Sequence, residues 1–142
     1  MRTKILRAPL VLIFLLCGCA TAYHSGKNPL LGVLGGAYWD ARGPGELTEV
    51  AFFGNGGQDQ STVARFITYR CAQLASKRGT PYFRMYEDLD EAIADIPTLR
   101  PIVGASGNHY GDYVYMLPES RYRSGDISTK YALLHYSPNA KN

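Results

Sequence analysis

The chain has 142 residues, of which 46% are hydrophobic and three are cysteines, and its formal net charge is +3. This length supports one domain with a hydrophobic core. Three of the 15 basic residues, Arg2, Lys4 and Arg7, lie in the first seven positions, and the other 12 balance the 12 acidic residues. The balance excludes the basic stripe that nucleic-acid-binding domains use, so we expect no nucleic-acid partner.

The amino-terminal segment has the pattern of a bacterial lipoprotein signal. An apolar run, Leu10–Leu16, follows the basic start and leads into Cys17-Gly18-Cys19. This pattern indicates a secretory signal peptide, and the run is shorter than the roughly 20 apolar residues of a membrane span. We expect cleavage between Gly18 and Cys19 and lipid chains, palmitate among them, on Cys19. Ala20 favours the outer membrane, with the protein facing the periplasm.

These features divide the chain into a signal peptide (1–18), a lipidated cysteine with a tether (19–36) and a single domain (37–142). The tether is rich in glycine and polar residues. The aliphatic segment 30–34 interrupts it, and either packs on the domain or lies against the membrane. With Cys71 as the one thiol left, no intramolecular disulfide is expected. The histidines lack the spacing of metal ligands, so we expect no metal and no cofactor.

The domain opens with two predicted strands, Tyr38–Asp40 and Glu46–Phe53. In the second, alternate residues fall on opposite faces, so Phe52 and Phe53 point to different sides. The glycine-rich segment 54–57 then reverses the chain, and it lacks the spacing of a phosphate-binding loop.

The strongest predicted helix is Asp59–Lys77. Asp59 or Ser61 can cap its start, and Gly79 suits its end. Apolar residues recur at helical spacing and form a stripe that we expect to pack on the sheet: Val63, Phe66, Ile67, Cys71 and Leu74.

Arg70 falls inside this apolar stripe, flanked on the helix by Phe66 and Leu74. Two structural roles remain open for its side chain. The stem covers apolar surface while the guanidinium reaches water, or the guanidinium pairs with a carboxylate from a neighbouring strand. We therefore expect Arg70, Cys71 and Phe66 at the contact between helix and sheet.

The remaining predicted elements are a strand at Thr80–Tyr86, a short helix at Asp90–Asp95, a weak strand at Pro101–Gly104, a strand at Asp112–Leu117 and a last strand at Lys130–Tyr136. Together these elements predict an α+β domain. Its antiparallel sheet has four or five strands, and one main helix covers one face of the sheet.

Four short motifs carry a resemblance to a known family: the signal start 18–21, F-x-G-N at 52–55, R-x-A-x-L at 70–74 and Y-F at 82–83. The chain resembles a family of small, uncharacterised proteobacterial outer-membrane lipoproteins over residues 16–24 and 37–86. Gln58 and Gln73 stand where that family carries Thr and Glu. The resemblance implies an α+β envelope lipoprotein and implies no activity.

Two binding functions follow from these observations. We favour a non-enzymatic accessory or adaptor lipoprotein, held on the membrane through Cys19, that contacts another envelope protein. The alternative is a module that binds carbohydrate or cell wall, because alternation along 112–117 places the rings of Tyr113 and Tyr115 on one side.

An enzyme is the third possibility. Ser106, His109 and Asp112 are the only group from which a hydrolase could be argued. Crowding of such residues in one turn is poor evidence for a triad, whose members are defined by geometry. We therefore predict that the protein is not an enzyme.

Overall fold

The computed structural model describes residues 24–25, 37–106 and 109–140. The predicted cleavage site at Gly18 and the predicted lipidation site at Cys19 lie outside the described residues, as does the aliphatic segment 30–34. Within the described residues, no helix combines the length and the apolar character that a membrane span requires.

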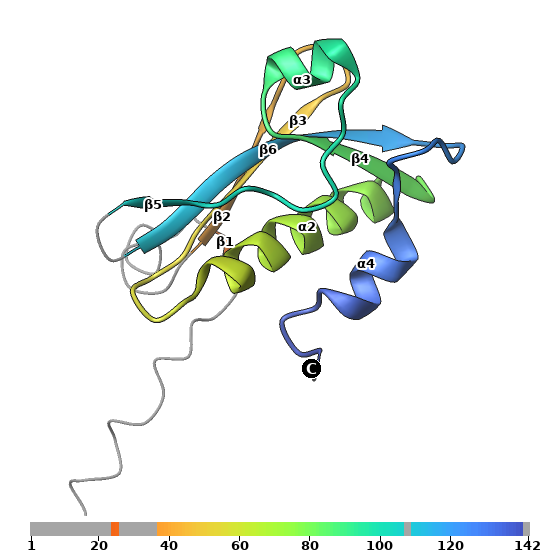
Figure 1. Cartoon of the computed structure of the whole chain (residues 1–142). Helices are drawn as coiled ribbons and strands as arrows, with labels where there is room; N and C mark the ends of the chain where they lie inside the picture. The colour runs from red at the N-terminus through yellow and green to blue at the C-terminus, as the bar shows by residue number, and fades with distance from the viewer. Residues whose placement is uncertain (1–23, 26–36, 107–108, 141–142) are drawn as a thin grey trace, which may run out of the picture.

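A single sheet forms the centre of the fold (Figure 1). Its strands are β1 (His24–Ser25), β2 (Ala37–Arg42), β3 (Thr48–Phe53), β4 (Tyr82–Tyr86), β5 (Gly104–Ser106), β6 (His109–Glu119) and β7 (Ile127–Ser128). The strand order is β1-β2-β3-β6-β4-β7, and β5 pairs with β6. All pairings are antiparallel except that of β1 with β2.

The predicted α+β class is confirmed, with an antiparallel sheet and one main helix on one face. Five strands of the described sheet have three or more residues, as expected, and β1 and β7 add two short pairings at its edges. Strand β1 belongs to the predicted tether and joins it to the first strand of the domain, because His24 pairs with Ala37 and Ser25 pairs with Tyr38.

Helix α2 (Gln60–Lys77) packs along one face of the sheet. The Asp59 carboxylate caps it by accepting a hydrogen bond of 2.7 Å from the Thr62 N–H, and Gly79 follows its end with a φ of +72°. Its apolar stripe packs on alternate residues of three strands to form the core: Val50, Phe52, Phe83, Met85, Val114 and Met116.

The predicted last strand at Lys130–Tyr136 is wrong, because this segment forms helix α4 (Thr129–His135). The Ser128 side chain caps it by accepting a hydrogen bond from the Tyr131 N–H. Ala132 and Tyr136 recur at helical spacing and pack on the core. Helix-forming Ala132, Leu133 and Leu134 and tertiary packing against α2 therefore override the strand preference of the two tyrosines (Figure 1).

The segment between β4 and β6 also differs in detail from the prediction. Helix α3 (Leu89–Ala94) begins one residue early, with Asp88 as its cap. The weak strand predicted at Pro101–Gly104 is displaced to β5, at Gly104–Ser106. Pro101 has no N–H, and the Glu87 carboxylate accepts the N–H of Ile102. Apart from one bridge between Thr98 and Met85 of β4, the segment therefore joins the sheet from Gly104 onward, where it pairs with β6.

Candidate functional site

The face of the sheet opposite α2 carries a row of aromatic side chains. The strand register places Trp39 of β2, Ala51 of β3 and Tyr113 of β6 directly beside one another. They point away from α2, because the intervening residues Phe52 and Val114 lie in the core. Trp39 is 50% exposed and Tyr113 is 40% exposed. Ala51, which lies between them in the register, is 1% exposed.

Phe53 extends this row toward the end of β3. It lies opposite Gly111 of β6 and on the same side as Ala51. A Cβ atom added at Gly111 would lie 2.5 Å from Cδ1 of Phe53, so the ring covers the glycine. The outer side of the ring remains open to solvent, and the residue is 57% exposed.

Tyr115 completes the group next to Tyr113. Their ring centroids are 5.8 Å apart and the rings meet edge to face at 83°. The Tyr115 hydroxyl donates a hydrogen bond of 3.3 Å to the carboxylate of Glu49, its neighbour on β3. Partial burial and the Glu49 charge raise the pKa of the Tyr115 hydroxyl. We call Trp39, Phe53, Tyr113 and Tyr115 the aromatic face.

A polar network covers the rest of this side of the sheet, over β4. The guanidinium of Arg84 is buried, with Nε 2.7 Å from the Asp126 carboxylate and Nη1 2.6 Å from that of Asp95. Its Nη2 donates to the carbonyl of Ser124 at 2.9 Å. These contacts hold the loop between β6 and β7 and the end of α3 against β4.

Tyr86 and Arg123 extend the network around Asp95. The Tyr86 hydroxyl donates to the Asp95 carboxylate at 2.7 Å, and Nη1 of Arg123 donates to it at 3.2 Å. Hydrogen bonds from Tyr86 and Arg84 hold the pKa of Asp95 below its usual value. Burial and the bond to Asp95 raise the pKa of Tyr86 to about 12. Because its charges are mutually paired, we assign the network a structural role.

The structure places the other predicted residues at the interface between α2 and the sheet. Nε and Nη2 of Arg70 each lie 2.9 Å from Oδ1 of Asp40 on β2. The guanidinium also lies over the Tyr38 ring, 4.0 Å from its centroid. Of the two roles left open for Arg70, the structure has the ion pair with a neighbouring strand.

Phe66 and Cys71 are buried in the core beside this ion pair. The Phe66 ring packs edge to face against Phe52, with centroids 5.1 Å apart. Burial raises the pKa of the Cys71 thiol above its usual value, so this thiol is protonated at neutral pH and is a poor nucleophile.

The residues considered for a hydrolase lie along the β5–β6 pairing, where Ser106 is opposite His109. The Asp112 carboxylate accepts the N–H of Gly104 at 3.2 Å and that of Tyr113 at 2.8 Å. These bonds engage the carboxylate with backbone, fixing β5 against β6. Among the residues that the structure describes, no group of three His, Cys, Asp or Glu side chains is placed to hold a metal ion.

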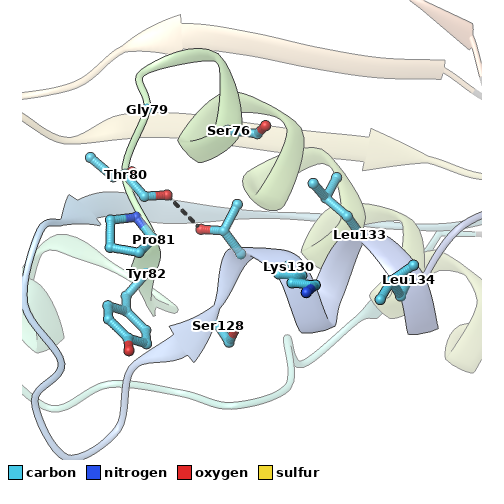
Figure 2. Close-up of a pocket in the computed structure, with 10 residues that line it drawn as sticks. Ser76, Gly79, Thr80, Pro81, Tyr82, Ser128, Lys130, Leu133 and Leu134 are labelled. Atoms are coloured by element: carbon cyan, nitrogen blue, oxygen red, sulfur yellow. Dashed lines mark hydrogen bonds between the residues drawn. The ribbon is translucent and has the colours of Figure 1, made fainter.

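A separate groove of about 520 Å³ lies between the end of α2, the start of β4 and α4 (Figure 2). Pro81 and Tyr82 line one side, and Leu133 and Leu134 of α4 line the other. A hydrogen bond of 2.9 Å from the Thr129 hydroxyl to the carbonyl oxygen of Thr80 joins the two sides. The groove is mainly apolar and lacks the convergent polar groups of a specific ligand site.

Sequence reasoning placed Tyr113 and Tyr115 on one side of a strand but did not place Trp39 or Phe53 beside them. The alternation along β3 already places Phe53 opposite to Phe52, which is a usable signal. The register that aligns Trp39 with Tyr113 comes from strand pairing and is not visible in a single strand. No family model, curated protein or solved structure matches this chain.

Proposed function

We propose that this chain is a lipid-anchored accessory or adaptor protein of the bacterial outer membrane. It faces the periplasm, catalyses no reaction, and binds another envelope protein through its aromatic face. The observation that carries the proposal is the grouping of Trp39, Phe53 and Tyr113, all at least 40% exposed, on neighbouring strands. Scattered exposed apolar residues are ordinary, whereas contiguous aromatic surface is typical of interaction sites.

The proposed anchor is the lipidated Cys19, which lies close to the first strand of the sheet along the chain. Lipid chains on the thiol and amine would hold the protein stably, because more than one chain is needed for lasting attachment. Cys19 lies five residues before His24 of β1. A chain spans at most about 3.6 Å per residue, so the β1–β2 edge would stay within about 18 Å of the lipid. This reach favours a partner close to the membrane.

The carbohydrate-binding alternative uses the same side chains in a different way. Sugar rings stack on flat aromatic surfaces, and Trp39 offers one exposed ring for this purpose. Tyr113 and Tyr115 meet at 83° and therefore do not form a flat platform together. This geometry supports a protein partner, into which edges and faces of rings can both pack.

Photo-crosslinking in intact cells of the native host tests this proposal. A photoreactive residue is placed at Phe53 on the aromatic face and, as a matched control, at the exposed Lys77 of α2. We expect one recurrent protein adduct from position 53 and its absence from position 77. Equal adducts from both positions, or monomer alone from both, would contradict the proposal.

A second assay distinguishes carbohydrate binding from binding of a protein partner. Retention of the protein on purified peptidoglycan is compared with that of Tyr113→Ala and Tyr115→Ala. A protein-binding face predicts retention that is weak and the same for all three proteins. Strong retention that is lost in the tyrosine variants would favour the carbohydrate alternative instead.

A further inference from the structure

A small cavity of about 280 Å³ lies beside α2, apart from the aromatic face. Four of its lining residues recur at helical spacing on α2, two come from the segment between α3 and β5, and one ends α4. In chain order they are Ser61, Ala64, Arg65, Thr68, Leu99, Arg100 and Tyr136. Two arginines from separate segments therefore meet at one cavity that no carboxylate lines.

Neither arginine forms an ion pair with a described residue, although the Arg65 guanidinium lies over the Phe66 ring, 5.3 Å from its centroid, and Arg100 is exposed. The ion pairs within the described residues are formed by Arg70, Arg84 and Arg123, and none involves Arg65 or Arg100. Nε of Arg65 is moreover buried without a hydrogen-bond acceptor. A buried donor without an acceptor is destabilising, so an acceptor entering the cavity would satisfy it.

The carboxylate nearest to Arg65 along the chain does not fill this role. Asp59 is occupied as the cap of α2, where it accepts hydrogen bonds from the Thr62 N–H and the Ser61 hydroxyl. The Thr68 hydroxyl likewise donates to the Ala64 carbonyl. Arg65, Arg100 and Tyr136 line the cavity, and their side chains carry the remaining hydrogen-bond donors.

We propose that this cavity binds a small oxyanion of the phosphate class, held between Arg65 and Arg100. The guanidinium group presents a planar fork of N–H donors that matches phosphate oxygens, and charge assistance strengthens those bonds. A volume of about 280 Å³ lies at the lower end for ligand pockets, which suits a phosphate group rather than a whole nucleotide. The site is independent of the aromatic face and of the anchor.

Titration of the purified full-length protein with inorganic phosphate, followed by NMR, tests this site. We expect saturable shifts of the Arg65 Nε–H and of amides at Ser61–Thr68 and Arg100. Arg65→Gln and Arg100→Gln should each weaken binding by about tenfold or more, because each removes a charged donor. Arg121→Gln, at an exposed position outside the cavity, should leave the affinity unchanged.

Two results would overturn the proposal. One is the absence of saturable shifts in the folded protein, and the other is equal weakening by Arg121→Gln, which would indicate a general charge effect. A parallel titration with short-chain phosphatidylglycerol distinguishes the source of the phosphate group. Tighter binding of the lipid than of inorganic phosphate assigns the site to a headgroup, and the reverse order assigns it to a free phosphate.

Discussion

Trp39 and Tyr113 flank Ala51 in one cross-strand row, and this alanine is 1% exposed between two exposed aromatic residues. Both rings are therefore carried by strands that pair with β3, and neither lies on a loop. A rigid aromatic surface loses little conformational entropy on binding. This arrangement is the physical basis for assigning the binding role to the aromatic face.

The contact between Phe53 and Gly111 yields a stability prediction. Gly111→Ala should destabilise the protein by about 1–3 kcal/mol, because the new Cβ would lie 2.5 Å from the Phe53 ring. Denaturant unfolding measures the change. Phe53→Ala should abolish most of the penalty in the double variant. A penalty that persists without the ring would show that the clash is elsewhere.

Gly104→Ala provides the matched control for that experiment. A Cβ at Gly104 would lie 3.6 Å from the nearest atom, which is an ordinary contact. We therefore expect a change within about 1 kcal/mol, set by the usual strand preference of alanine over glycine.

The buried ion pair of Arg84 with Asp126 predicts a large loss of stability when the carboxylate is removed. Asp126→Ala should cost about 3–5 kcal/mol of unfolding free energy, because it leaves the buried guanidinium without one of its two carboxylates. Glu119→Ala removes an ion pair with the half-exposed Arg123 and should cost at most about 1 kcal/mol. Comparable losses in the two variants would contradict the structural role of the network.

The pair of Arg70 and Asp40 should contribute less than the buried pair, since both side chains remain partly exposed. A double-mutant cycle with Arg70→Gln and Asp40→Asn should give a coupling energy of about 0.5–1 kcal/mol. Arg70→Lys should recover only part of it, because lysine cannot reproduce the two contacts to one carboxylate and the stacking on Tyr38. A coupling near zero would mean that the pair does not position α2.

The lowered pKa of Asp95 predicts how the stability of the protein changes at acidic pH. Tyr86 and Arg84 lower the pKa of this carboxyl in the folded protein. Its contribution to the free energy of unfolding is therefore complete above the pKa of the unfolded chain, about 3.9. That contribution is lost as the pH falls through the pKa of the folded protein. Asp95→Asn should reduce stability at pH 7 and flatten this loss below about pH 4. Asparagine tolerates the left-handed backbone at this position, where φ is +53°, so the variant tests the charge. An unchanged acid profile would contradict this assignment.

Local periodicity and capping chemistry were sufficient to predict α2, with Asp59 as one of two candidate caps, and the alternation of β3 and β6. They failed for α4, because Tyr131 and Tyr136 favour a strand until the packing of this segment against α2 is known. The Arg84 network was also beyond reach, since Asp126 is 42 residues away from Arg84. Residues are brought together there by topology, which a single strand or helix does not encode.

The intact mass of the protein isolated from its native host tests the central claim most directly, because the location and the partner class both depend on the anchor at Cys19. We predict a mature chain that starts at Cys19 and carries diacylglyceryl and acyl groups, palmitate among them. A chain that retains residues 1–18, or one that bears an unmodified Cys19 thiol, would contradict the claim.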